Sequence, residues 1–193
     1  MAKRFVSIWF RHLKTDWFQL RRPALKDSPF VLAISEHGRK LVAAADPMAE
    51  AQGIYPGATV ADARAIIPGI QVIDDIPGLP EKLLTALAAW AIRFTPSAAI
   101  DLPGGLLLDS TGCAHLWGGE EPYLQTIQNR LQTAGYDIRI AMADTIGAAW
   151  GQARYGDQPL LTCQTQSEAL LSLPPAALRL EPAILDKLQK LGF

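Results

Sequence analysis

Residues 106–119 read LLLDSTGCAHLWGG, a short apolar run that ends in an acid and passes into a glycine-containing segment. The run Leu106 to Asp109 predicts a short strand. Another short strand, Ala98 to Asp101, comes before it. The residues between the two, Leu102-Pro103-Gly104-Gly105, are of the kind that forms a tight connection. We therefore expect two neighbouring strands joined by this loop.

The elements around this pair predict a ferredoxin-like sheet. In chain order, the apolar spacing predicts a strand at 3–10, a helix at 81–94, the two strands above, a helix at 120–134, a strand at 136–143 and a helix at 145–155. The order β, α, β, β, α, β, α is that of the split βαβ arrangement. The expected fold class is therefore α+β, with a mixed or antiparallel sheet backed by helices.

Residues 12–75 interrupt this order and are expected to form a small inserted subdomain. An amphipathic helix at 12–22 is followed by two strands, 30–35 and 40–45, that form a hairpin. Two short helices come next, the first capped by Asp46, and residues 71–74 form a brief strand. The loop 77–80, rich in proline and glycine, is the expected boundary with the rest of the fold.

Composition excludes several classes of protein. The chain has 193 residues, of which 49% are hydrophobic and 19% are charged, as in ordinary globular proteins. No apolar run approaches the ~20 residues that cross a bilayer, and no export signal is visible, so we expect a cytoplasmic protein without a membrane partner. Cys113 and Cys163 are far apart, which suits a reducing compartment. Cys113 and His115 lack the further ligands that zinc requires, so neither a metal site nor a cofactor is expected.

Positive charge is concentrated in the first part of the chain. Residues 1–40 carry nine Lys or Arg and three Asp or Glu, whereas the remaining residues carry nine and sixteen. This asymmetry can mark a phosphate-facing surface, although a solvated face without a ligand gives the same pattern. His12 and His37 lie in the same region, where they could contact phosphate or simply be exposed to solvent.

Four segments resemble the Y-family DNA polymerases of the UmuC and DinB type. Residues 22–33, RRPALKDSPFVL, resemble the family's N-P-x-L-x-x-x-P-hydrophobic segment. Residues 41–69 resemble its V-x-x-x-x-Y-x-A-R run, and residues 138–156 resemble its strand and helix S-x-G-[IV]-A-x-x-K-x-x-A-K-x-A-S. Residues 106–119 resemble its Y-L-D-V-T segment in the form of the ImuB branch, where the threonine is followed by G-C-A-H-L-[FW]-G-G. The resemblance covers essentially the whole chain.

This resemblance implies a division into subdomains. It places a palm at 1–11 and 76–165, fingers at 12–75 and the beginning of a helical thumb at 166–193. Complete family members continue through the thumb into a little-finger domain. The resemblance therefore implies that the chain is part of a longer protein.

The resemblance also implies that the metal-binding carboxylates are absent. Polymerases join nucleotides with two divalent ions about 3.5–4 Å apart. Active family members hold these ions with an aspartate on the first strand and with an adjacent Asp-Glu pair. In this sequence, Ile8 and Phe10 occupy the acidic positions of the first strand, and Gly104 and Gly105 occupy those of the Asp-Glu pair. The two nearby acids, Asp101 and Asp109, are too few to hold the two ions.

The nucleotide-binding positions depart from the family pattern as well. The family's Tyr and Arg in the fingers fall on Pro47 and Glu50, so that an anion replaces a cation meant for phosphate. The family's Lys that precedes a proline falls on Gln158. The steric-gate aromatic falls on Leu13. We therefore expect no nucleotide site.

The function implied by the resemblance is that of a non-catalytic, polymerase-like scaffold in a DNA-damage-inducible complex for SOS mutagenesis and translesion synthesis. The implied partners are a RecA-like ImuA protein, an error-prone C-family DNA polymerase, the sliding clamp (through regions beyond this chain) and primer-template DNA, in the bacterial cytoplasm and nucleoid. The candidate DNA-phosphate contacts are Arg11, Lys14, Arg39 and Lys40. Two alternatives stay open: an active translesion polymerase with displaced metal ligands, and a protein-interaction module that does not contact DNA.

Overall fold

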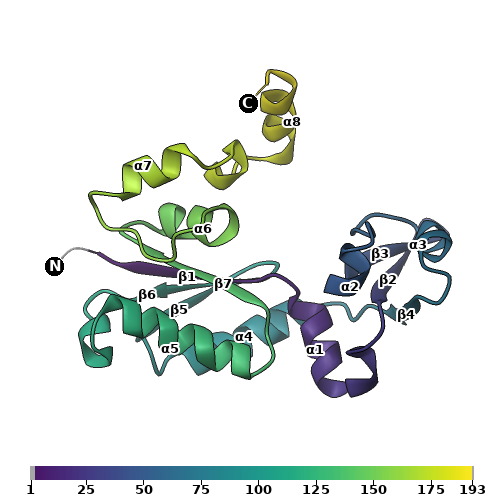
Figure 1. Ribbon diagram of the computed structural model, residues 1–193, viewed down its shortest axis with the longest axis horizontal. Helices are drawn as coiled ribbons and strands as arrows, with labels where there is room; N and C mark the ends of the chain where they lie inside the picture. The colour runs from purple at the N-terminus through teal and green to yellow at the C-terminus, as the bar shows by residue number, and fades with distance from the viewer. Residues whose placement is uncertain (1–2, 193) are drawn as a thin grey trace.

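The chain folds around two separate β-sheets (Figure 1). The computed structural model describes residues 3–192. The strands are β1 (Phe5–Phe10), β2 (Phe30–Glu36), β3 (Arg39–Ala45), β4 (Gln71–Asp74), β5 (Ser97–Asp101), β6 (Gly105–Asp109) and β7 (Ile138–Ala143). The α-helices are α1 (Leu13–Arg21), α2 (Pro47–Glu50), α3 (Val60–Ile66), α4 (Leu79–Ala91), α5 (Glu120–Thr133), α6 (Ile146–Tyr155), α7 (Gln166–Leu171) and α8 (Pro182–Lys190). Short 3₁₀ turns are η1 (Pro23–Leu25), η2 (Ala114–Trp117) and η3 (Pro175–Leu178).

The larger sheet, with the strand order β5-β6-β1-β7, forms the large unit together with α4, α5 and α6. All of its strand pairs are antiparallel. Helices α4 and α5 cover one face, and α6 lies on the other (Figure 1). Val6, Ile8 and Phe10 of β1 are buried in the core between the sheet and α4–α5. This confirms the predicted α+β class with an antiparallel sheet backed by helices, in the ferredoxin-like strand order.

The bounds of several elements differ from the predicted ones by one to three residues, and two of these differences have a clear structural reason. Residues 77–80 are predicted as a loop, yet Leu79 and Pro80 form the first turn of α4, because proline fits the start of a helix. The last strand is predicted from residue 136 but begins at Ile138. Tyr136 remains tied to the end of α5, since its N–H donates to the carbonyl of Leu131 at 3.1 Å.

The smaller sheet, with the order β3-β2-β4, forms the small unit together with α2 and α3. Strands β2 and β3 form the predicted hairpin, and β4 pairs with β2 in parallel. The buried Asp46 carboxylate fixes the exit from β3, because its Oδ1 accepts from the N–H groups of Ala49 and Phe30, each at 3.0 Å. A fixed turn at this point sets the position of α2 beside the large unit.

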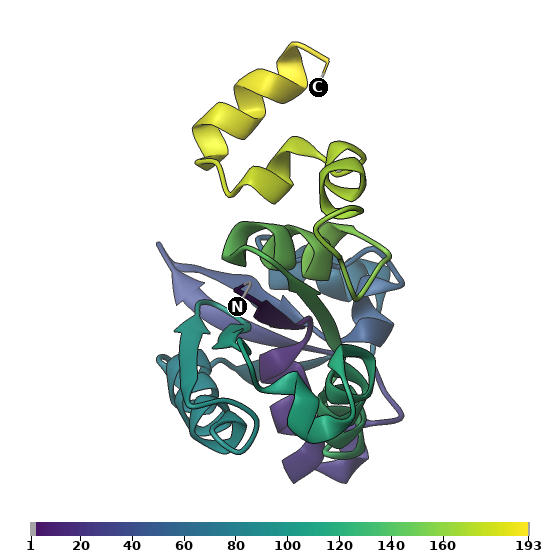
Figure 2. The same ribbon diagram turned by 90° about the vertical axis from the view of Figure 1, so that its left-hand side faces the viewer.

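Helices α7 and α8, with η3 between them, form the C-terminal segment. It lies beyond α6, on the side away from α5 (Figure 2). Its principal contacts with the large unit are those of α7 and η3 with α6. Within residues 3–192, no helix is long and apolar enough to span a membrane.

Candidate functional site

A cleft of about 300 Å³ lies where the end of β1 and the start of α1 face the small unit. Phe10, Leu13, Glu50 and Gly104 line it, so four of the metal- and nucleotide-site positions named from the sequence resemblance meet in one place. The other lining residues are 9, 11, 12, 14, 15, 43–45, Pro56, Pro80 and Pro103. The cleft is therefore the candidate site.

Three of the other positions lie apart from the cleft. Ile8 is fully buried in the core of the large unit. Pro47 is exposed in the first turn of α2. Gln158 lies on the loop after α6 and lines a different hollow. The structure therefore does not bring all of the expected metal- and nucleotide-site positions together.

Strand β1 presents its side chains alternately to two faces of the sheet. Ile8 and Phe10 point into the core toward α4 and α5. Trp9 points to the other face, where it lies across from Gly105 and has the guanidinium of Arg154 at 5.7 Å from its ring centroid. None of the residues from Phe5 to Phe10 is acidic, so neither face of β1 offers a carboxylate.

The two glycines of the β5–β6 connection are tightly enclosed. The Phe10 N–H donates to the Gly104 carbonyl at 2.8 Å, and a Cβ added to Gly104 would lie 3.0 Å from the Phe10 carbonyl oxygen. A Cβ added to Gly105 would lie 2.9 Å from Asp101 Oδ2 and 3.0 Å from Arg154 Nη2. The space beside Gly105 is thus filled by an ion pair.

That ion pair belongs to a cluster that the sequence pattern did not reveal. Asp101 Oδ2 accepts from Arg154 Nη2 at 2.9 Å and from Trp150 Nε1 at 2.8 Å. Its Oδ1 accepts from Arg179 Nη2, in the C-terminal segment, at 3.1 Å. The Arg154 guanidinium also stacks on Trp150, 4.1 Å from the ring centroid. Asp101 is therefore bound by two guanidinium groups and one indole.

The charged side chains at the cleft are paired with one another. His12 is buried rather than exposed. Its Nε2 lies 3.0 Å from Glu50 Oε2 and its Nδ1 lies 3.1 Å from Asp137 Oδ2, so the ring bridges the small and large units. Arg11 Nη1 lies 3.5 Å from the same Asp137 oxygen. Lys14 Nζ contacts both oxygens of Asp75 at 3.0 Å. The charges of Arg11 and Lys14 are thus partly offset within the protein.

The other two candidate DNA contacts lie on the β2–β3 hairpin, away from the cleft lining. Arg39 and Lys40 are exposed at the start of β3. Lys40 Nζ lies 3.1 Å from Asp74 Oδ1, beside the Asp75 that holds Lys14. Adjacent aspartates at the end of β4 therefore bring Lys14 and Lys40 into one region. Arg39 has no ion pair within the described part of the chain. His37, at the hairpin turn, is exposed.

Two further carboxylates near the large sheet have perturbed pKa values. Burial raises the pKa of Asp16 to about 6. This carboxylate accepts from the Asp137 N–H at 2.9 Å and so ties α1 to the start of β7. Hydrogen bonds from the side chain and the N–H of Thr111 lower the pKa of Asp109. Both carboxylates therefore have protein partners.

The described residues offer little to a metal ion. Among residues 3–192, no group of three or more His, Cys, Asp or Glu side chains lies close enough together to hold one. Asp101 lies across from Gly105 at one end of β6, and Asp109 lies four residues along that strand. At ~3.4 Å per residue, the two are about 14 Å apart along the strand.

Comparisons with known proteins fit this arrangement. Residues 8–152 match the model of the IMS family, described as the impB/mucB/samB family. The chain belongs to the impB/mucB/samB family. It is 44% identical over 142 residues to Protein ImuB of Caulobacter vibrioides, an alignment that covers 73% of this chain and 31% of that protein. This impB/mucB/samB chain thus spans about a third of the length of that relative.

Solved structures show the same fold. The post-insertion binary complex of Dbh DNA polymerase superposes with a TM-score of 0.81 at 16% identity, covering 98% of this chain and 57% of the polymerase chain. DinB from Sulfolobus solfataricus gives a TM-score of 0.76 at 15% identity, with the same coverage. The predicted resemblance to the Y-family, and to its ImuB branch, is confirmed. The exact palm, fingers and thumb boundaries stay a prediction.

Proposed function

We propose that this chain is a polymerase-like scaffold without nucleotidyl-transfer activity that acts in damage-tolerant DNA synthesis. The cleft carries the proposal. It occupies the junction of the two units, and Glu50 is the acid that lines it within the described residues. Where a two-metal site would need further acids, the walls of the cleft present Phe10 and Gly104, with Gly105 beside them.

Electrostatics explains why such a cleft is unsuited to two-metal chemistry. Two divalent ions about 4 Å apart repel each other by about 4 kcal/mol at the dielectric constant of water, and by more inside a protein. Several carboxylates must offset this repulsion. Glu50 is already paired with His12, and the space beside Gly105 is next to the cationic Arg154. The charges around the cleft therefore do not favour the binding of two divalent cations.

The remaining acids of the β5–β6 hairpin do not rebuild the site. Asp101 is engaged by Arg154 and Arg179, and Asp109 is about 14 Å away along the strand. A two-metal site requires its ligands to meet around ions about 3.5–4 Å apart. This separation argues against an active polymerase with displaced ligands.

The chemistry in this proposal comes from a partner. The 44% identity to Protein ImuB supports the assembly implied by the sequence resemblance: a RecA-like ImuA protein, an error-prone C-family DNA polymerase and the sliding clamp, in the bacterial cytoplasm. In this assembly the C-family subunit joins nucleotides. The chain here supplies a polymerase-shaped surface for DNA and for these proteins.

We also propose that this surface holds primer-template DNA weakly, through phosphate contacts of the β2–β3 hairpin and the cleft edge. Arg39 and Lys40 are exposed and basic, and Arg39 has no ion pair among the described residues, whereas Lys40, Arg11 and Lys14 have aspartate partners that partly offset their charge. Sequence-independent phosphate contacts of this kind weaken steeply as salt rises. The expected affinity is therefore low at physiological salt.

Primer extension tests the proposal. The chain is incubated with primer-template DNA, all four nucleotides and Mg²⁺ or Mn²⁺, with Dbh DNA polymerase as a positive control. We expect no extension above the protein-free sample. Extension by the chain that Asp109→Ala or Asp101→Asn abolishes would establish an active enzyme and overturn the proposal.

A further inference from the structure

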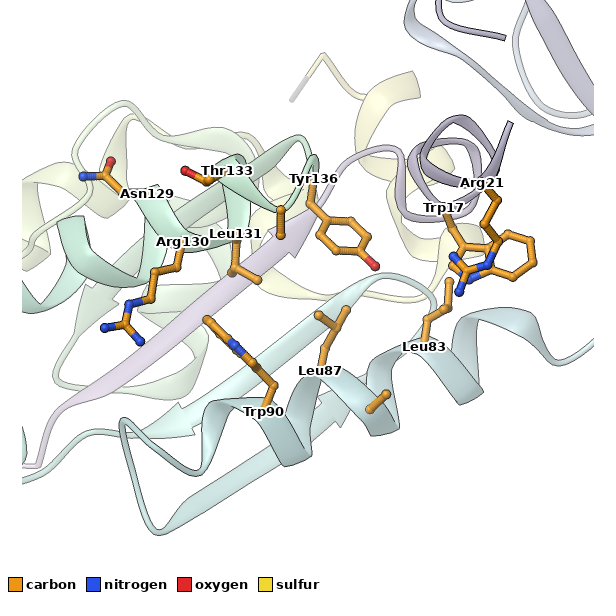
Figure 3. Close-up of a pocket in the computed structure, with 12 residues that line it drawn as sticks. Trp17, Arg21, Leu83, Leu87, Trp90, Asn129, Arg130, Leu131, Thr133 and Tyr136 are labelled. Atoms are coloured by element: carbon orange, nitrogen blue, oxygen red, sulfur yellow. The ribbon is translucent and has the colours of Figure 1, made fainter. Parts of the chain in front are cut away.

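A second and larger hollow, of about 590 Å³, lies among α1, α4, α5 and the residues that follow α5 (Figure 3). We call it the α4–α5 groove. It shares no lining residue with the cleft described above. Its volume falls in the range of specific binding sites in proteins. It is therefore a separate site.

The groove presents a regular apolar row. Leu83, Leu87 and Trp90 lie at spacings of four and three on α4, so they share one face of that helix. Figure 3 shows Leu87 and Trp90 below Leu131 of α5 and the ring of Tyr136. The row spans about 10 Å at 1.5 Å per residue. This length suits two turns of a helix that inserts side chains at positions i, i+3 or i+4, and i+7.

Two arginines mark opposite ends of the groove. Arg21 lies at the α1 end and Arg130 at the other (Figure 3). The Arg21 guanidinium stacks on Trp17 at 4.0 Å from the ring centroid, and that of Arg130 lies 5.6 Å from the ring of Phe94. The lining includes no Asp or Glu, and within residues 3–192 neither arginine has an ion pair. The groove is therefore apolar in the middle and positive at both ends.

We propose that the α4–α5 groove binds a short amphipathic helix of a partner protein, with apolar residues on one face and acidic residues near both ends. The apolar row supplies the buried contact, and Arg21 and Arg130 pair with the acids. Charge complementarity of this kind fixes orientation and excludes basic partners.

Two other occupants fit less well. Single-stranded nucleic acid stacks its bases on aromatic faces, but Arg21 covers Trp17 and Arg93 lies 5.2 Å from the centroid of Trp90. A second copy could offer α8, whose Ile184 is exposed, but Lys187 and Lys190 make that helix basic. Both alternatives therefore become outcomes of the test.

The test is a selection of displayed helical peptides, random at every position, against the wild-type chain. We expect enrichment of peptides with apolar residues at i, i+4 and i+7 and with net negative charge. Their affinities are then measured by fluorescence anisotropy. Ala86→Arg places a bulky cation on an exposed lining position and should weaken binding at least about tenfold.

A matched control uses Ala89→Arg, because Ala89 is exposed on the same helix but does not line the groove. This variant should leave the affinity within about twofold. Arg21→Glu with Arg130→Glu should weaken the acidic peptides by about tenfold or more and should admit the same peptides with lysine in place of the acids. Thermal unfolding of each variant verifies the fold.

Three results would overturn the proposal. The first is a selection that enriches no apolar periodicity, or that enriches basic peptides. The second is equal loss of binding in Ala86→Arg and Ala89→Arg. The third is evidence for another occupant. Displacement of the peptides by single-stranded oligonucleotide would assign the groove to nucleic acid, and concentration-dependent dimerisation that Ala86→Arg abolishes would assign it to a second copy. Primer extension is independent of each of these results.

Discussion

Replacement of Gly105 by alanine tests whether a side chain fits at a position where the sequence resemblance predicts an acid in active polymerases. The added Cβ would lie 2.9 Å from Asp101 Oδ2, 3.0 Å from Arg154 Nη2 and 3.1 Å from the Asp101 carbonyl oxygen. Relief requires movement of Asp101, which also binds Trp150 and Arg179. Extra volume in a packed site costs about 1–3 kcal/mol. We expect a loss of about 2 kcal/mol, which at this chain length lowers the Tm by about 4–8 °C.

The assay is differential scanning calorimetry with two further variants. Gly147→Ala is the control, because a Cβ there meets nothing within 4 Å and alanine favours the helix α6, so its Tm should stay equal or rise. Asp101→Ala combined with Gly105→Ala should cost less than the sum of the single changes, since the first change removes the obstructing carboxylate. If Gly105→Ala leaves the Tm unchanged, the position has room for a side chain and the steric part of the account fails.

Three further predictions follow from other contacts. Because burial raises the pKa of Asp16 from 3.8 to about 6, this carboxyl stays protonated in the folded state at pH values where the unfolded chain has released the proton. The contribution of Asp16 to stability therefore falls as the pH rises from about 4 to about 6 and is level above. Asp16→Asn should abolish this fall, and it should raise the free energy of unfolding in urea at pH 8 by at most about 3 kcal/mol. If the fall persists in the variant, it does not come from Asp16. Arg4 binds both oxygens of Glu120 at 2.7 Å and Asp144 at 2.6 Å, so Arg4→Ala should lower the free energy of unfolding by about 3 kcal/mol in the same assay. A loss of about 0.5 kcal/mol, as for a surface substitution, would show that this network contributes little. Arg39→Glu with Lys40→Glu should weaken binding to primer-template DNA and lower its logarithmic salt slope by about 1–2, and an unchanged affinity would remove the hairpin from the DNA surface.

Local patterns in the sequence predict the elements of this fold well. The strand before Ser110 and the helix after Gly119 are found where the apolar runs predict them, because their side chains alternate or repeat with the period of the element. The parallel pairing of β4 with β2 was not predicted. A strand of four residues carries no signal of its partner strand. Gln71 of β4 pairs with Phe30 of β2, which lies 41 residues earlier in the chain.

Contacts between distant residues explain what the sequence missed at the site. His12 joins Glu50 and Asp137, which are 38 and 125 residues away along the chain. Lys14 is held by Asp75, 61 residues away. A count of charges treats such residues as exposed, whereas tertiary structure pairs them. That residues 8, 10, 104 and 105 are not acidic, in contrast, is visible in the residue types alone.

The most direct measurement for the central claim is a Mn²⁺ titration followed by electron paramagnetic resonance, with deoxynucleotide and primer-template DNA present. Dbh DNA polymerase serves as the reference, since two-metal catalysis requires it to hold divalent ions. For this chain the account predicts no protein-dependent Mn²⁺ binding beyond that of the nucleotide and DNA alone. Saturable binding of two Mn²⁺ ions per chain, lost on replacement of Glu50 or Asp101, would contradict it.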